Sequence, residues 1–334
     1  MKKLFLLVAM ACALLACEEQ NQPEEPQTPP STTEPEPDPQ AENGMAAYFI
    51  NPVAWNGNFV EISNALLYQS ALAKATAPAL AQDEVTYPII SVTPTDGTWP
   101  IDLSVNYGDS AIVGADGLEH SGIMRIHATG PFESEGAVLT PTFENFKVYG
   151  SVLTGTQTIT NTGKNEAGNL VYDVTVANGL LGNEREYIYS EHTLRELVEG
   201  LDDNGHLVPD LAAHRYSITG QMKMESHVDT IPGYEVTIDS IPMIISVGDL
   251  YPTGGLMHIA LDQPIVFEMN VSGFSGPVSI QYIDLQFTGK TAKNTYGAKM
   301  VITVQMAMFS MNLTLLCELN EEGIVPESVQ YVWE

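Results

Sequence analysis

The sequence predicts an all-β protein, an antiparallel meander of many strands that forms a barrel or a sandwich-like domain, with one short N-terminal helix. Two observations lead to this prediction. Apolar and polar residues alternate with the two-residue period of a half-buried strand over much of the chain after residue 99, and short turn sequences rich in Gly, Asn and Asp separate these stretches. Strands of a parallel sheet would be uniformly apolar and separated by helices, and neither pattern is present.

The first residues have the composition of an export signal. Lys2 and Lys3 precede an apolar run that is too short to span a bilayer and has the length of a signal-peptide core. The run ends in LLAC, which resembles the lipobox of bacterial lipoproteins, in which the cysteine carries the lipid. The resemblance implies that residues 1–16 form a signal peptide, and that lipidation of Cys17 anchors the protein in the outer membrane.

Residues 17–44 are rich in acidic residues and proline and contain almost nothing that could form a core. Such a segment cannot bury enough apolar surface to offset its ordering entropy, so we expect a disordered, extended tether. Glu18 and Glu19, directly after Cys17, resemble the acidic tract that many Bacteroidetes lipoproteins use for display on the cell exterior. The expected location is therefore the outer face of the outer membrane.

Residues 45–334 are expected to form the folded domain. From Phe59 to Leu72 the apolar residues recur with a helical period, which predicts an amphipathic helix at about residues 58–73. Asn56 or Asn58 could cap this helix, and Pro78 marks its latest end. We expect the helix to cover one end of the β structure.

The meander is expected over about residues 99–334. Its clearest strand has Ile101, Leu103, Val105 and Tyr107 on one face. Further strands are expected at residues 121–129, 137–148, 152–162, 170–177 and 186–197. Asn178-Gly179 carries the strongest short signal for a hairpin turn. The predicted core contains Leu103, Val105, Tyr172, Val174, Val176, Met222 and Val304.

Charge and cysteine content exclude several classes of function. The formal net charge is −29 at pH 7, so binding to nucleic acid, which requires a basic surface, is not expected. An acidic surface suits solubility, divalent cations or neutral glycans. Once the leader is removed and Cys17 lipidated, Cys317 is the one cysteine left. The mature chain is therefore expected to have no internal disulfide and no thiolate metal site.

No catalytic motif is found, and neither a cofactor nor a metal site is expected. His120 and His127 are seven residues apart and should lie on opposite faces of a regular strand. The acidic loops at residues 109–116 and 202–205 lack the ligand spacing of known calcium loops and are interpreted as solvated turns. The methionines near the C-terminus, including Met300, Met306 and Met308, alternate with apolar residues and are interpreted as core.

Four stretches carry a resemblance: IDLSVNYG at residues 101–108, GLEHSGIMRIHATG at residues 117–130, FENFKVYG at residues 143–150 and GTQTITN at residues 155–161. Together they resemble a family of uncharacterised Bacteroidetes lipoproteins. The resemblance covers roughly residues 91–220 and implies an N-terminal helix followed by a long β meander. It implies no activity, because these motifs are turn and strand signatures. This chain lacks the paired cysteines of the pattern, near Tyr87 and residues 109–111.

Three short sequences resemble the Asp-Ser/Thr-aliphatic acceptor that Bacteroidetes use for O-glycosylation of exported proteins. The acceptor residues are Ser110, Thr230 and Ser240. Glycan attachment requires an exposed loop or sheet edge, so the order of preference is Ser110, then Thr230, then Ser240.

Three classes of function remain open. A lipid-anchored surface module that binds glycan or protein without catalysis accounts for the anchor, the tether and the absence of catalytic motifs. A structural subunit of a fimbria-like assembly is the alternative, although fimbrial maturation uses a basic cleavage site near the first strand, and there is no basic residue between Cys17 and Lys74. A glycan hydrolase is the least favoured, because chance carboxylate pairs occur in any acidic protein.

Overall fold

The computed structural model describes most of the chain. It covers residues 39–74, 87–182, 185–249, 251–271, 274–306, 309–320 and 323–334. The expected signal peptide, Cys17 and the tether up to residue 38 lie outside the described residues. No helix in the described ranges combines the length and the apolar character needed to cross a bilayer.

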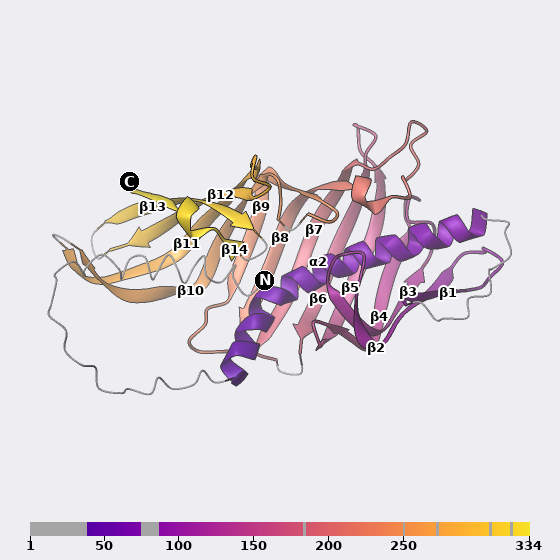
Figure 1. Ribbon diagram of the computed structural model, residues 1–334, viewed down its shortest axis with the longest axis horizontal. Helices are drawn as coiled ribbons and strands as arrows, with labels where there is room; N and C mark the ends of the chain where they lie inside the picture. The colour runs from indigo at the N-terminus through magenta and orange to yellow at the C-terminus, as the bar shows by residue number, and fades with distance from the viewer. Residues whose placement is uncertain are drawn as a thin grey trace.

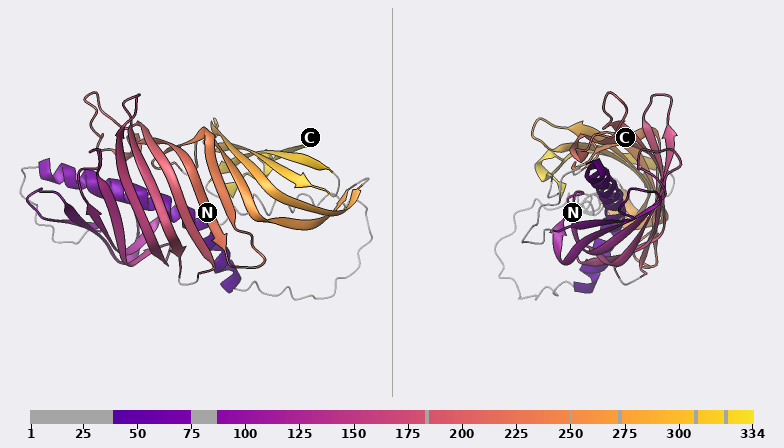
Figure 2. Two further views of the ribbon diagram at one scale, coloured as in Figure 1. Left: turned by 180° about the vertical axis from the view of Figure 1, so that it is seen from behind. Right: turned by 90° about the vertical axis from the view of Figure 1, so that its right-hand side faces the viewer.

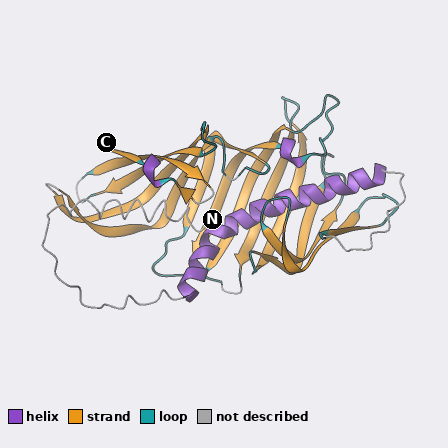
Figure 3. Ribbon diagram, in the orientation of Figure 1, coloured by secondary structure: helices purple, strands orange, loops and turns teal. Residues whose placement is uncertain are grey.

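One antiparallel sheet contains every strand of the described chain (Figure 3). Each strand pairs with its neighbour in sequence from the first to the fourteenth, and the fifteenth returns to pair with the thirteenth. The predicted antiparallel meander is therefore confirmed. The strands are β1 (Ile89–Thr93), β2 (Ile101–Val113), β3 (Glu119–Ala128), β4 (Val138–Val148), β5 (Ser151–Lys164), β6 (Leu170–Leu181), β7 (Tyr187–Glu199), β8 (Arg215–Ser226), β9 (Tyr234–Ser246), β10 (Gly255–Val271), β11 (Phe274–Lys290), β12 (Tyr296–Gln305), β13 (Ser310–Asn320), β14 (Gly323–Ile324) and β15 (Gln330–Trp333).

The sheet is long, twisted and strongly curved, and it stays open (Figure 2). In the described residues β1 forms one edge, β14 and β15 lie at the other, and these two edges do not pair with one another. Of the two alternatives left open by the sequence, a barrel and a sandwich-like domain, the closed barrel is therefore not formed by the described strands. The right-handed twist of neighbouring strands accumulates along the sheet and curves it. In the described residues the two edge strands do not close the concave side, and the N-terminal helix lies there.

The helix α2 (Pro39–Lys74) lies in the concave side of the sheet and crosses its strands (Figures 1 and 2). The predicted helix is confirmed, and its end is within one residue of the expected position. Its start is not near residue 58, because the helix extends back through six residues of the expected tether. It also does not cover one end of the sheet, since it runs across the inner face against β6 and β7.

The earlier start of α2 has a local explanation. Asn56 and Asn58 do not cap the helix, because their side chains face the sheet, where Asn56 binds Arg195 and Asn58 binds Gln157. The helix therefore continues past them and through Pro52. Proline has no amide hydrogen and interrupts the helical hydrogen bonds, which is an ordinary cause of the bend seen toward the N-terminal end of α2 in Figure 1.

The first core lies between α2 and the inner face of the N-terminal strands. Trp55, Phe59 and Ile62 of the helix pack there among alternate residues of β2 to β8. Of the predicted core residues, Leu103, Val105, Tyr172, Val174 and Val176 are buried in this cluster, while Met222 is partly buried against it. The predicted face of β2, with Ile101 and Tyr107, is also buried.

The second core belongs to the C-terminal strands and contains no residue of α2. It includes Met300, Val304 and Met306, which confirms that these methionines are core residues, whereas Met308 lies outside the described residues. Cys317 is buried in the same cluster, and burial raises the pKa of its thiol to about 11. A thiol that stays protonated at neutral pH behaves as a small apolar side chain.

The prediction of a hairpin at Asn178-Gly179 is wrong, because both residues lie inside β6. Asn178 adopts a positive φ of 52°, and the pairing of β6 with β7 shifts between Val176 and Gly179, which defines a bulge. At this bulge the absence of a side chain on Gly179 makes room for Trp55 of the helix. A Cβ atom on Gly179 would lie 2.5 Å from Nε1 of Trp55.

Candidate functional site

A buried polar cluster joins α2 to β3 and the turn before it. His120 Nε2 lies 2.9 and 3.0 Å from the two carboxylate oxygens of Asp116, and the side chains of these two residues are 0% and 2% exposed. Glu61 of α2 is also buried, and its Oε1 accepts a hydrogen bond of 2.9 Å from the Asp116 backbone amide. One imidazole and two carboxylates therefore meet where the helix contacts the sheet.

The turn between β2 and β3 places Asp116 in this cluster. Gly114 donates its amide to the Leu118 carbonyl at 2.8 Å, and the Asp116 carboxylate accepts from the Leu118 amide at 2.9 Å, so the turn is closed on itself. Gly114 packs directly against the cluster. A Cβ atom at this position would lie 2.4 Å from Glu61 Oε1, 2.7 Å from His120 Cδ2 and 3.0 Å from Asp116 Oδ1, so only glycine fits.

The electrostatics of the cluster centre on Glu61. Its Oε2 accepts a hydrogen bond from the Tyr107 hydroxyl. Burial, and then the facing Asp116 carboxylate, raise the pKa of Glu61, while the hydrogen bonds from Tyr107 and the Asp116 amide act in the opposite direction. Burial and the charge of Glu61 raise the pKa of the Tyr107 hydroxyl in turn, which keeps it a hydrogen-bond donor.

Glu61, Asp116 and His120 can each offer one ligand atom to a metal ion, and these three atoms lie within 4.8 Å of one another. The expectation that residues 109–116 form a solvated turn is therefore wrong for Asp116, whose carboxylate faces inward. The turn at residues 202–205 agrees with its interpretation, because Asp202 binds the backbone amides of Asn204 and His206 in an exposed loop.

A second buried polar cluster holds the helix against β7. Arg195 Nη2 donates to Glu191 Oε1 at 2.8 Å, and Nη1 donates to Asn56 Oδ1 of α2, also at 2.8 Å. The guanidinium carbon lies 4.5 Å from the centre of the Phe59 ring, within the range of a cation–π contact. Arg195 and Glu191 are both buried, so this ion pair is screened little by solvent.

Amide side chains add a third set of contacts between helix and sheet. Asn51 donates to the Gly179 carbonyl at 3.1 Å and accepts from Trp55 Nε1 at 3.0 Å, while Asn58 donates to Gln157 Oε1 on β5. Asn51 uses both ends of its amide in this way, whereas Asn58 bonds through its nitrogen and its buried Oδ1 has no partner among the described residues. The polar contacts therefore fix the position of α2 along its axis, which apolar packing alone would leave adjustable.

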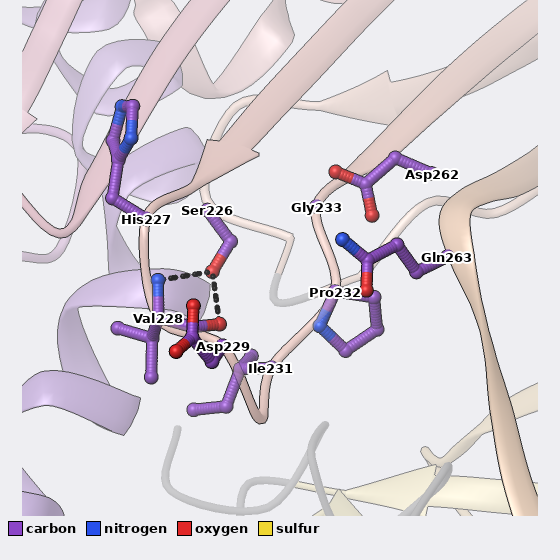
Figure 4. Close-up of a pocket in the computed structure, with 9 residues that line it drawn as sticks. All are labelled: Ser226, His227, Val228, Asp229, Ile231, Pro232, Gly233, Asp262 and Gln263. Carbon is purple, nitrogen blue, oxygen red and sulfur yellow. Dashed lines mark hydrogen bonds between the residues drawn. The ribbon is translucent and has the colours of Figure 1, made fainter.

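A surface pocket lies between the β8–β9 turn and β10. Its volume is about 250 Å³, and its ionisable residues are His227, Asp229 and Asp262. Figure 4 shows that His227 and Asp262 stand on opposite sides of the pocket and that Asp229 lies beside Val228. These three side chains do not converge on a common point, so the pocket brings together no acid–base pair.

The structure separates the predicted modification sites. Ser110, Thr230 and Ser240 are all exposed, on β2, in the β8–β9 turn and on β9 respectively. They lie on different strands and form no common site. His120 is buried and the His127 side chain is 52% exposed, so the expectation of opposite faces is confirmed. Cys17, the predicted lipidation site, lies outside the described residues.

No protein family, curated protein or solved structure matches this chain. The site is therefore interpreted from its own geometry. Sequence reasoning missed both ionic clusters, although one signal was available. Glu191 and Arg195 alternate in phase with Tyr187, Tyr189 and Leu197, which places two charged residues on the inner face of a strand.

Two fully buried tyrosines provide a test of the cluster. Tyr107→Phe is expected to lower the free energy of unfolding by about 1–3 kcal/mol, because Glu61 loses the donor that its buried oxygen requires. Tyr172→Phe is the matched control, since its buried hydroxyl has no hydrogen-bond partner among the described residues. Its removal should be neutral or stabilising. Chemical denaturation of both variants measures the difference, and equal losses would contradict the role assigned to Tyr107.

Proposed function

We propose that this protein is a lipid-anchored cell-surface module on the outer membrane that binds an extracellular glycan and does not process it. The sequence resemblance to Bacteroidetes lipoproteins supports the anchor, the location and the export. The outer face of the C-terminal strands supports the binding role. A protein ligand on the same face is the alternative.

The observation that carries this proposal is the surface of β11, β12, β13 and β15 that faces away from the second core. Tyr282 is 54% exposed there and lies in register with Thr303, which lies opposite Asn312 and donates to its side-chain oxygen. Leu316 and Val332 are exposed on the same side. An exposed aromatic ring beside hydroxyl and amide groups on rigid strands suits the stacking and hydrogen bonding of a neutral sugar.

The buried location of the carboxylate pair argues against hydrolysis. A glycan hydrolase needs two carboxyl groups on either side of a bond in the substrate. Glu61 has the raised pKa that a general acid requires, but Glu61 and the Asp116 side chain are each 2% exposed beneath α2. A polysaccharide cannot reach them without displacement of the helix, so a role in folding or in binding a small ion suits them better.

A glycan array combined with a hydrolysis screen on the mature chain tests the binding role. We expect binding without turnover, and weaker binding by Tyr282→Ala. Tyr149→Ala is the matched control, because Tyr149 is exposed in the turn between β4 and β5. Turnover of any polysaccharide that a single carboxylate substitution abolishes would refute the proposal. If no glycan binds but an extracellular protein is retained through Tyr282, the ligand is a protein.

The anchor is tested separately. The several acyl chains of a bacterial lipoprotein each contribute about 0.8 kcal/mol per buried methylene, so together they give practically permanent attachment. Cys17→Ala is therefore expected to leave the folded domain unchanged and to move the protein from the membrane fraction to the soluble fraction, or to leave it as an uncleaved precursor. Added protease should cleave wild-type protein on whole cells if it faces outward. Normal processing of Cys17→Ala with retention in the membrane would contradict the lipid anchor.

A further inference from the structure

We propose that Glu61, Asp116 and His120 bind a divalent transition metal ion, with Zn²⁺ as the best fit, and that this ion fastens α2 to the β2–β3 turn. The inference is independent of the glycan-binding role, because the cluster lies under the helix and the proposed binding face lies on the outer side of distant strands. The donor set of one imidazole nitrogen and carboxylate oxygens is typical of Zn²⁺ sites. Calcium and magnesium prefer oxygen ligands alone.

The composition of the cluster favours a cation. In the described part of the chain neither Glu61 nor Asp116 forms an ion pair with a lysine or arginine, and His120 is the one basic group in contact with them. Two carboxyl groups therefore share one imidazole in a buried site. Buried charge is retained in proteins when it is paired or when it coordinates a metal.

The hydrogen bonds of Glu61 leave room for a metal ligand role. Both oxygens of Glu61 already accept hydrogen bonds, Oε1 from the Asp116 amide and Oε2 from the Tyr107 hydroxyl. Each oxygen of Glu61 therefore keeps a second lone pair that can face an ion.

The spacing of the three ligand atoms also suits a metal ion. His120 Nε2 lies 2.9 and 3.0 Å from the two oxygens of Asp116, so the imidazole and the carboxylate already face one another. Metal–ligand bonds of about 2.0–2.2 Å place ligand atoms up to about 4.4 Å apart. The three ligand atoms lie within 4.8 Å of one another, so a slight contraction of the cluster accommodates the ion.

The backbone around the cluster is shaped for close approach. A Cβ atom on Gly57 of α2 would lie 2.2 Å from Asp116 Oδ2, and one on Gly114 would lie 2.4 Å from Glu61 Oε1. Because neither glycine has a side chain, the helix and the turn can lie close to the two carboxylates. The ring of His120 is fixed by stacking on Phe146 at 5.3 Å.

One feature lowers the affinity of the site. In the metal-bound form His120 Nδ1 carries the proton, and this buried atom has no hydrogen-bond partner among the described residues. Zinc-bound histidines usually donate this proton to a carboxylate or carbonyl, and loss of such an outer partner weakens metal binding about 10–100-fold. The role that suits such a site is that of a structural clamp between α2 and the β2–β3 turn.

The experiment uses untagged full-length protein freed of metal with a chelator. Calorimetric titration with Zn²⁺ is expected to show one equivalent bound per chain, and saturating Zn²⁺ should raise the melting temperature. His120→Gln and Asp116→Asn should each lower the affinity for this Zn²⁺ ion by more than the roughly 10–100-fold that accompanies loss of an outer partner. The reason is that each substitution removes a direct ligand. The matched control is His127→Gln, which removes the exposed imidazole paired with Asp102 and should bind like the wild type.

Two results would overturn the proposal. One is a wild-type chain that binds no Zn²⁺ equivalent and gains no thermal stability from it. The other is a folded His120→Gln variant that keeps the equivalent with wild-type affinity, which would assign the ion to surface histidines. If one of the two ligand variants fails to fold, the other, compared with His127→Gln, still decides between a metal clamp and a cluster held by hydrogen bonds alone.

Discussion

Replacing Arg195 by methionine is expected to lower the free energy of unfolding by about 3–5 kcal/mol, because Glu191 remains as a buried charge without its partner. Methionine keeps most of the side-chain volume of arginine, so the loss of unfolding free energy reports on charge and hydrogen bonding. The variant also removes the contact of Arg195 with Asn56 and with the Phe59 ring, which releases the helix from β7. Equilibrium denaturation followed by circular dichroism measures the change.

The exposed ion pair of Arg125 with Glu144 provides the control for this prediction. The two side chains lie 2.7 Å apart but are 53% and 56% exposed, so Arg125→Met should cost less than about 1 kcal/mol. A double variant, Arg195→Met with Glu191→Leu, should recover much of the loss, since it removes the unpaired buried charge. Losses of similar size for Arg195→Met and Arg125→Met would show that the buried pair does not hold the helix.

Val174→Asp is expected to prevent stable folding or to lower the melting midpoint drastically. Val174 is fully buried in the first core, and Ile159 and Thr193 lie opposite it on the two neighbouring strands. The nearest basic residue in the register, Arg195, is already paired with Glu191, so the folded state would bury either an excess negative charge or a protonated acid. The cost is several kcal/mol, a large part of the stability of an ordinary domain.

Thr158→Asp is the matched control, on the neighbouring strand β5. Thr158 lies opposite Thr175 on the outer face, where a new carboxylate stays in contact with water. We expect a change within about 1 kcal/mol, as for most surface substitutions. Melting curves of the two variants compare the two faces of the sheet, and effects of equal size would mean that the inner and outer faces are wrongly assigned.

The strand faces could be predicted from the sequence because they depend on a local rule. Successive side chains of a strand point to opposite sides, so the alternation from Ile101 to Tyr107 was enough to place their buried face. Asn178-Gly179 shows the limit of local rules. Asn and Gly both tolerate a positive φ, which is found in hairpin turns and in bulges alike. The ring of Trp55, which packs against Gly179 at the bulge, comes from over a hundred positions earlier in the chain.

The buried polar clusters could not be predicted, since their members come from distant parts of the chain. Nothing near Glu61 indicates that it will meet Asp116 and His120, and an acidic residue in an amphipathic helix is ordinarily assigned to the solvent face. The start of α2 was missed for a related reason. The residues before Asn56 show no clear apolar period, and the sheet that holds this part of the helix is formed by later segments.

The order of the elements along the chain has a consequence for biogenesis. Every strand up to β14 finds its partner in the segment beside it, but Asn56 of α2 must wait for Arg195, 139 residues later. Until β7 has formed, α2 therefore lacks part of the surface on which it docks. We expect the helix to be fixed in place late in folding, after the strands around β7 have paired.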